Sequence, residues 1–153
     1  MSTFLEHLRA ALAPAYELGD ELSGAGMSRV FVATDVALGR KVVVKVLPPD
    51  LAAGVNRDRF RREIQLAAQL QHPHIVPLLS AGEDGELLYY TMPFIEGESL
   101  RARVERKVRF SVRDVMRVLH DVVDALDYAH ARGVVHRDIK PGNILTSGAH
   151  SLV

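Results

Sequence analysis

The 153-residue sequence contains no cysteine, and its nineteen Lys and Arg residues balance nineteen Asp and Glu residues. The absence of cysteine excludes disulfides and cysteine-based zinc sites, and it is consistent with the reducing cytoplasm, where we expect the protein to reside. A formal net charge of zero gives neither the basic stripe of a nucleic-acid binder nor the polybasic patch of a membrane binder. We therefore expect no nucleic-acid partner.

The sequence also lacks an uninterrupted apolar segment long enough to span a bilayer. Residues 1–15 end in small residues, as a signal cleavage site does, but Glu6, His7 and Arg9 interrupt the apolar stretch that a signal peptide needs. We expect a short amphipathic helix here, ended by Pro14. With 48% hydrophobic and 25% charged residues, the chain suits one globular domain or two small lobes sharing a cleft.

Most of the first half is rich in β-forming residues. They predict five strands separated by turn signals, at residues 15–22, 28–36, 41–47, 75–82 and 86–94. Between the third and fourth strands, apolar positions recur at helical spacing. They predict a helix from Asn56, as N-cap, to Gln71, just before Pro73.

From Glu96 onward the pattern is mainly helical. Ser111 and Asp114 have the spacing of a capping box, and Arg132 with Gly133 ends the helix that they begin. Its apolar stripe consists of Val112, Val115, Met116, Leu119, Val122, Val123, Leu126 and Ala129. Residues 134–145 then predict a strand, a loop and a strand. The order of elements indicates two lobes with a hinge near residues 92–97.

Lys45 lies inside "KVVVKVL", a stretch that predicts a buried strand. A buried ammonium group is costly unless it is paired. Glu63 follows Phe60 by three residues and precedes Ala67 by four, so its carboxylate faces the same way as those apolar side chains. We predict that Lys45 and Glu63 pair between sheet and helix. The alternative is a lysine reaching solvent from an edge strand, with the glutamate at the border of the stripe.

Two loops contain candidate ligand-binding groups. "SGAGMS", residues 23–28, has small residues that would let backbone N–H groups approach an anion, although a simple tight turn fits equally. In "HRDIKPGN", Asp138 is suited to act as a general base, Lys140 to neutralise a phosphoryl group, and Asn143 to bind a hard cation such as Mg²⁺. The alternative for this second loop is a polar surface turn.

Together, "VVVK", then Glu63 in "FRREIQLAAQLQHPHIVPL", then "HRDIKPGNIL" resemble the signature set of protein kinases, from about Tyr16 to Val153. "DIKPGN" resembles the serine/threonine type, and "MPFIEGESL" is bacterial in style. The resemblance implies an α+β fold with a five-stranded antiparallel N-lobe sheet, one inserted helix and an incomplete helical C-lobe. It divides the chain into an N-terminal helix or extension (1–15), the N-lobe (16–95) and a partial C-lobe through the catalytic loop (96–153).

The resemblance also implies roles. Lys45 would contact the α- and β-phosphates of ATP and Glu63 would hold it in place, while Asp138 would be the catalytic base, Lys140 a phosphate-stabilising partner and Asn143 a Mg²⁺ ligand. Around the adenine it implies Met92 as gatekeeper, the backbone of Pro93 and Ile95 at the adenine edge, and Val30, Val43 and Leu145 against the ring faces.

The glycine-rich loop departs from the family. Beside Leu22, Ser23 and Ala25 stand where the family prefers glycine, as does Ser28, and Gly24 and Gly26 fall at the intervening positions. Side chains there restrict the backbone near the phosphates, so the resemblance leaves the affinity for ATP open.

The D-F-G motif, whose aspartate is the main Mg²⁺ ligand of the family, does not occur among the 153 residues. We therefore expect the front part of a kinase domain, inactive as given, with a large exposed apolar patch along the helix that begins at Ser111.

Three functions remain open. The first is a fragment of a serine/threonine kinase that transfers the γ-phosphoryl group of ATP to protein hydroxyls; it implies protein substrates and leaves a homodimer of the full-length parent open. The second is a nucleotide-binding or scaffolding pseudokinase. The third is a small-molecule phosphotransferase, disfavoured by the Lys-Pro-x-Asn spacing after Asp138.

Overall fold

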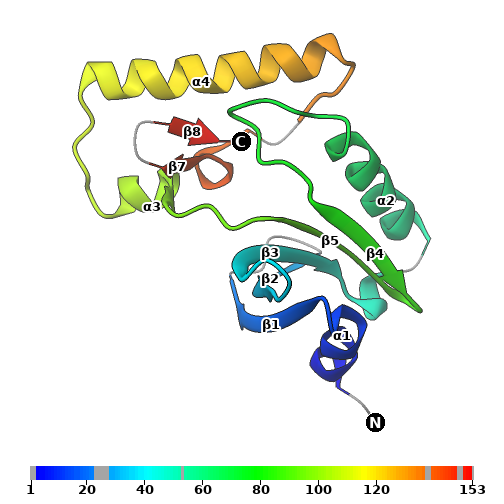
Figure 1. The fold of residues 1–153 in the computed structure, drawn as a ribbon. Coiled ribbons are helices and arrows are strands. Elements are labelled where there is room, and N and C mark those ends of the chain that lie inside the picture. The colour runs from blue at the N-terminus through cyan, green and yellow to red at the C-terminus, as the bar shows by residue number, and fades with distance from the viewer. Residues whose placement is uncertain (1–2, 23–27, 53, 137–138, 148–149, 153) are drawn as a thin grey trace. The chain divides into compact units, whose positions relative to one another are not determined.

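The structure is a computed structural model, and it describes residues 3–22, 28–52, 54–136, 139–147 and 150–152 (Figure 1). The chain forms two compact units. The first unit comprises Met1–Gln69 and Leu78–Phe94, and the second comprises Leu70–Pro77 and Ile95–Val153. The boundary after Phe94 falls inside the hinge predicted at residues 92–97.

A five-stranded antiparallel sheet forms most of the first unit. Its strand order is β1 (Tyr16–Glu21), β2 (Arg29–Asp35), β3 (Arg40–Leu47), β5 (Leu87–Pro93) and β4 (Ser80–Asp84). This confirms the predicted sheet. The fourth strand was predicted from residue 75 but begins only at Ser80, because residues 70–77 belong to the second unit.

Alternation along β3 divides the first unit into two apolar clusters, one on each face of the sheet. Val42, Val44 and Val46 face α1 (Phe4–Leu12), whose Leu8 and Leu12 are buried against them. The predicted N-terminal helix is thus confirmed, and it closes one face of the sheet.

The opposite face packs against α2 (Val55–Ala67), through Leu47, Phe60, Leu88 and Tyr90. The predicted N-cap, Asn56, is wrong. The cap is Gly54, because the chain enters the helix with a φ of 57°, which glycine adopts at little cost. A short 3₁₀ helix, η1 (Pro49–Leu51), precedes α2.

The second unit contains a small antiparallel sheet of β6 (Glu98–Ser99), β7 (Leu145–Ser147) and β8 (His150–Leu152), with the helices α3 (Leu100–Glu105), η2 (Pro141–Asn143) and α4 (Val112–Ala131). The capping box of Ser111 and Asp114 is confirmed. The strand predicted after α4 is wrong: Val134 donates its N–H to the Ala129 carbonyl and completes the end of the helix instead.

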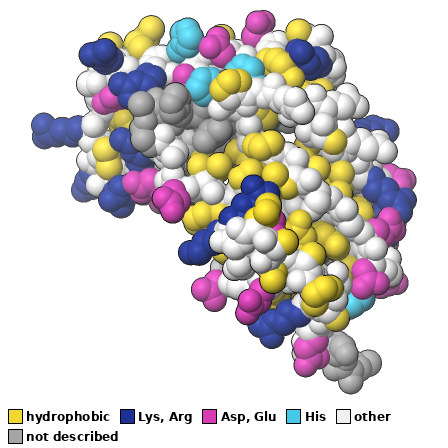
Figure 2. Space-filling view, viewed as in Figure 1, with side chains coloured by type: hydrophobic (Ala, Val, Ile, Leu, Met, Phe, Trp, Pro, Cys, Tyr) yellow, Lys and Arg dark blue, Asp and Glu magenta, His cyan; other side chains and the backbone are white. Residues whose placement is uncertain are grey.

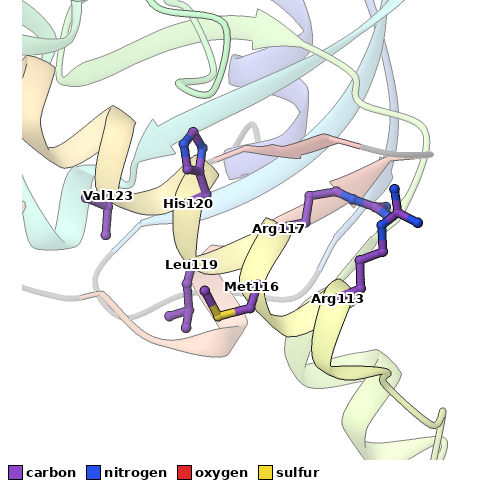
Figure 3. A pocket seen from close by; sticks show the side chains of 6 residues that line it. All are labelled: Arg113, Met116, Arg117, Leu119, His120 and Val123. Atoms are coloured by element: carbon purple, nitrogen blue, oxygen red, sulfur yellow. The ribbon is translucent and has the colours of Figure 1, made fainter.

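Much of the predicted apolar stripe of α4 faces outward. Val122 and Ala129 are buried, whereas the stripe residues Val112, Val115, Met116, Leu119 and Val123 are 45% to 81% exposed. Together with flanking polar side chains, this surface forms an open pocket lined by Arg113, Met116, Arg117, Leu119, His120 and Val123 (Figure 3). The stripe is therefore not a buried face, and the expected exposed apolar surface lies on α4.

Side chains of both charges are interspersed over the face shown in Figure 2. This arrangement agrees with the formal net charge of zero. None of the helices in the described part of the chain is both long and apolar enough to cross a membrane.

Candidate functional site

Lys45 and Glu63 form the predicted ion pair. The Nζ atom of Lys45, on β3, lies 2.7 Å from Oε1 of Glu63, on α2, and their side chains are 24% and 44% exposed. The edge-strand alternative is excluded, since β3 pairs with both β2 and β5. An internal strand therefore presents the ammonium group to a helix that supplies the opposite charge.

Tyr90 on β5 is a third member of this cluster, which the sequence analysis missed. Its hydroxyl donates to the same Oε1 atom of Glu63 at 2.8 Å. The Lys45 Nζ atom lies 5.7 Å from the centre of the Tyr90 ring. Burial and the neighbouring Glu63 charge raise the pKa of Tyr90 well above its usual range. Only the register of β3 against β5, which pairs Lys45 with Tyr90, identifies this tyrosine.

Strand register places four predicted nucleotide-contacting residues on one face of the sheet. Val30 stands opposite Lys45, and Val43 stands opposite Met92. Directly opposed residues of antiparallel strands share a face. This is the face that packs against α2, and Met92 contacts the apolar cluster there. The sheet therefore aligns apolar side chains beside the Lys45 ammonium.

The remaining predicted residues of the first unit lie at the ends of its strands. Pro93 is the last residue of β5, opposite Val42. Leu22 follows β1 and donates its N–H to the Val30 carbonyl at 2.8 Å. The glycine-rich stretch from Ser23 to Gly26 lies outside the described residues. The first unit thus places the strands on either side of that stretch.

The second unit contains Ile95, Lys140, Asn143 and Leu145. Asn143 ends η2 and donates its N–H to the Lys140 carbonyl at 2.9 Å, and Leu145 begins β7. Asp138, the predicted base, lies outside the described residues. The described part of the chain contains no group of three or more His, Cys, Asp or Glu side chains arranged to bind a metal ion.

Gly97 shows how closely two segments of the second unit approach each other. A Cβ atom at this position would lie 2.2 Å from the Thr146 carbonyl oxygen, and the residue has a φ of 152°. Only glycine permits this approach. β6 therefore lies against β7, the strand that follows Asn143 and begins with Leu145.

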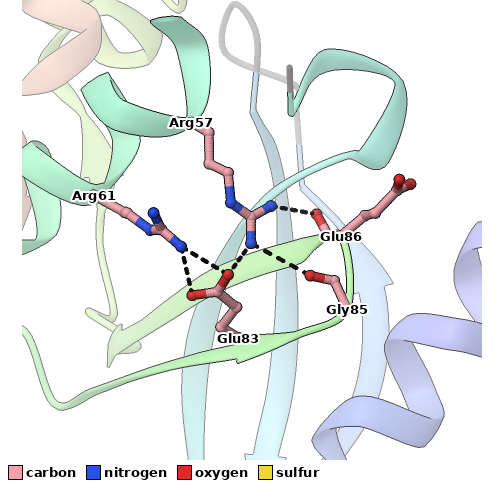
Figure 4. Close-up of polar contacts among 5 residues, drawn as sticks. All are labelled: Arg57, Arg61, Glu83, Gly85 and Glu86. Carbon is pink, nitrogen blue, oxygen red and sulfur yellow. Dashed lines mark hydrogen bonds and ion pairs between the residues drawn. The ribbon is translucent and has the colours of Figure 1, made fainter. Parts of the chain in front are cut away.

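Two arginines attach α2 to the turn between β4 and β5 (Figure 4). Arg61 donates to both carboxylate oxygens of Glu83, at 2.8 and 3.0 Å, and Arg57 also pairs with Glu83. Arg57 reaches the backbone carbonyls of Gly85 and Glu86 as well. The bonds from Arg61, and then those from Arg57, lower the pKa of Glu83. These contacts hold the helix that carries Glu63.

Residues 70–77 contact α4, which explains why they belong to the second unit. The Gln71 N–H donates to the Tyr128 hydroxyl at 3.0 Å. Nε2 of His74 lies 3.3 Å from Oδ1 of Asp121, and both of these side chains are largely buried. The segment that follows α2 is thus bound to α4.

Comparison with known proteins agrees with this geometry. Residues 16–152 match the family model described as the protein kinase domain. The chain belongs to the protein kinase family. Its five-stranded antiparallel sheet, and the ion pair between a lysine of an internal strand and a glutamate of the adjacent helix, agree with this. The resemblance and the fold class predicted from sequence are confirmed.

The similar proteins include bacterial serine/threonine-protein kinases. A probable serine/threonine-protein kinase of Corynebacterium efficiens is 43% identical over 139 residues, which are 88% of this chain and 21% of the relative. The serine/threonine-protein kinase PknB of Mycobacterium leprae is 41% identical over 146 residues, 92% of this chain and 24% of the relative. The chain therefore spans about a fifth to a quarter of the length of these curated relatives.

Solved structures of similar fold include the PknI kinase domain of Mycobacterium tuberculosis. It is 31% identical in sequence and superposes with a TM-score of 0.75. The matched region covers 92% of this chain and 58% of the PknI chain. The folds therefore correspond over most of the described residues.

Proposed function

We propose that this chain is the nucleotide-binding part of a bacterial-type serine/threonine protein kinase, which transfers the γ-phosphoryl group of ATP to protein hydroxyls. The observation that carries the proposal is the Lys45–Glu63 ion pair, on the face of the sheet that also presents Val30, Val43 and Met92. Relatives named as serine/threonine-protein kinases support it.

The residues of the first unit fit an adenine nucleotide. ATP, when bound, supplies the phosphoryl group. Lys45 would hold the α- and β-phosphates with its ammonium group, and Glu63 would keep that group in place. Val30 and Val43 would contact the adenine ring from the sheet, beside Met92 as gatekeeper. Backbone groups of Pro93 and Ile95, with Leu145, would complete the adenine contacts, and residues 22–26 would cover the phosphates.

The catalytic groups are assigned to the loop before β7. Asp138 would accept the proton of the substrate hydroxyl, and Lys140 would stabilise charge on the transferring group. Asn143 offers one neutral oxygen to Mg²⁺, a cation that binds few protein ligands alongside phosphate oxygens. Because D-F-G is absent from these 153 residues, we expect the 153-residue polypeptide alone to transfer phosphate at no useful rate.

The wider setting of the activity is also part of the proposal. We assign residues 1–15 to an N-terminal extension, 16–95 to the kinase N-lobe and 96–153 to a partial C-lobe. The absence of cysteine favours the cytoplasm, and the proposed activity requires protein substrates. A homodimer of the full-length parent is compatible with this assignment.

Nucleotide binding provides the first test. ATP with Mg²⁺ should raise the unfolding temperature of the 153-residue chain, because a ligand that binds only the folded state stabilises it. Lys45→Met should abolish the shift, and Asp138→Asn should retain it. Equal shifts for the original chain and Lys45→Met would overturn the proposed nucleotide site.

A nucleotide-binding pseudokinase is the second candidate, favoured by Ser23 and Ala25 at positions where kinases prefer glycine. Radiolabelled phosphate transfer separates the two, in a longer chain that continues past Val153 through a D-F-G motif. Transfer that Asp138→Asn abolishes supports the kinase. Nucleotide binding without transfer supports the pseudokinase.

A further inference from the structure

We propose that Tyr90 is a positioning residue of this site: its hydroxyl holds the Glu63 carboxylate in the orientation that pairs with Lys45. The arrangement of the three side chains stands on geometry alone, and only its effect on nucleotide binding rests on the proposed function. Glu63 Oε1 accepts from Lys45 at 2.7 Å and from Tyr90 at 2.8 Å.

The ion pair alone is a weak positioning device. Lys and Glu are long side chains, and a partly exposed pair gains little free energy because fixing both side chains costs rotamer entropy and solvent screens the attraction. With 44% of its side chain exposed, Glu63 has room for other rotamers. A further contact is needed to keep the carboxylate oriented.

Tyr90 supplies a fixed donor. It lies on β5, between β3 and β4, and is only 7% exposed. Its ring packs against Phe60 on α2, with ring centres 5.5 Å apart. Tyrosine has few rotatable bonds, so a buried ring on an internal strand places its hydroxyl in one position. Glu63 is therefore held from a rigid strand as well as by a flexible lysine.

The donor also persists over a wide pH range. Burial, followed by the Glu63 charge, raises the pKa of the Tyr90 hydroxyl, so the group keeps its proton at neutral and mildly alkaline pH. A protonated phenol can donate to a carboxylate, whereas a phenolate would repel it. Tyr90 and Lys45 thus act on one oxygen as a neutral and a charged donor.

The reactivity of the Lys45 amine tests the positioning. Contact with the Glu63 carboxylate covers the Lys45 nitrogen, and an acylating reagent attacks that nitrogen only when it has left the contact. In the 153-residue chain, Tyr90→Phe keeps the ring and removes the hydroxyl. We expect it to raise the acylation rate of Lys45 relative to Lys41 about three- to tenfold, the effect of losing one hydrogen bond of ordinary net strength. Mass spectrometry of the peptides measures both rates.

Matched variants define the outcome. Tyr89→Phe removes the same atom from the neighbouring residue, which packs on the other face of the sheet, and should leave the ratio unchanged. Glu63→Gln removes the carboxylate charge and should raise the ratio at least as much as Tyr90→Phe. General loosening of the fold would raise both lysine rates together. An unchanged ratio in Tyr90→Phe, alongside a raised one in Glu63→Gln, overturns the proposal.

Binding of ATP with Mg²⁺, measured by calorimetry on the same variants, separates this inference from the proposed function. Weaker binding in Tyr90→Phe, with normal binding in Tyr89→Phe, supports both. A raised lysine ratio with no nucleotide binding by any variant, including the original chain, leaves Tyr90 as the positioning residue and overturns the nucleotide site.

Discussion

At the scale of single residues, Glu63 joins two strands to a helix through one carboxylate oxygen. Lys45 reaches it from β3 and Tyr90 from β5. Removing either donor leaves the other one in contact with this oxygen. Loss of this contact costs more at the Tyr90 hydroxyl than at the Lys45 ammonium. Tyr90 is only 7% exposed, so water does not replace Glu63 as the partner of its hydroxyl.

Alkaline unfolding provides a prediction for Tyr90. Its pKa in the folded state is raised above its unfolded value of about 10, so folding favours the protonated phenol. The stability from this shift is fully present below pH about 10 and is lost as pH rises further. Urea unfolding between pH 9 and 11 should show a smaller fall for Tyr90→Phe than for the original chain. Tyr89, with a pKa also raised by burial, should retain part of the fall. Parallel curves for the two proteins would contradict the prediction.

Gly97→Ala should destabilise the second unit. The new methyl group would meet the Thr146 carbonyl oxygen, and the φ of 152° is unfavourable for alanine. We expect a loss of about 1–3 kcal/mol or more in the free energy of unfolding. Gly142→Ala is the matched control, because the nearest atom to its methyl group would be the Arg101 Cδ at 3.9 Å. Similar unfolding midpoints for both variants in urea would show that β6 can move away from β7.

The sequence was sufficient to predict the Lys45–Glu63 pair but not Tyr90. A lysine among valines and a glutamate on an apolar helix face each break a local pattern, and two such exceptions are best explained by one contact. Tyr90 breaks no pattern, because tyrosine is common in half-buried strands. Its role depends on which residue of β3 stands opposite it, a fact of strand register.

At the scale of elements, α2 is held by apolar packing on one face and by two arginine side chains. Phe60 packs into the apolar cluster beneath the helix, while Arg57 and Arg61 bind Glu83 at the turn between β4 and β5. Spacing of apolar residues predicted the helix, but not its cap at Gly54, since a positive φ leaves no mark in periodicity. The arginine contacts likewise depend on the fold, because Glu83 lies on a strand that follows a segment of the other unit.

Glu83→Gln should loosen the amino-terminal part of α2. Losing the carboxylate charge weakens the bonds from Arg61 and Arg57, so the amides of α2 should exchange faster with deuterium. Glu86→Gln is the matched control, because Arg57 reaches the backbone carbonyl of Glu86 and its carboxylate points away (Figure 4). Equal exchange rates in the two variants would show that the Glu83 carboxylate does not stabilise α2.

The same carboxylate predicts a response to acid. The pKa of Glu83 is lowered below its ordinary 4.5, so its contribution to stability is present above that pH and is lost as pH falls through the folded value. In the original chain, exchange of the α2 amides, corrected for the intrinsic rate, should become faster below pH about 4.5. In Glu83→Gln this acceleration should be absent.

At the scale of the whole molecule, the two units differ in how completely they bury apolar side chains. The first unit encloses a cluster on each face of its sheet, whereas α4 in the second unit exposes Met116, Leu119 and Val123. The helix and its limits followed from caps and periodicity. The sequence did not predict which face of α4 is buried, because periodicity identifies an apolar face but not the partner that packs against it.

The exposed face of α4 should bind an apolar dye. Replacing Met116 and Leu119 together by Gln should lower fluorescence from anilinonaphthalene sulfonate and reduce aggregation, with little change in the unfolding midpoint, because both side chains are more than half exposed. Val122→Gln, at a buried position of the same helix, is the contrasting variant and should destabilise. Unchanged dye binding in the double variant would place the exposed apolar surface elsewhere.

The assignment of residues 70–77 to the second unit has a practical consequence for dissecting the protein. The chain passes between the units after Gln69, after Pro77 and again after Phe94. A protease nick at the last of these junctions would release residues 95–153 as a separate polypeptide, and residues 70–77 of the second unit would stay covalently attached to the first. A recombinant fragment ending at Phe94 would retain Gln71 and His74 while discarding Tyr128 and Asp121, so neither half can be cloned cleanly by cutting at one point.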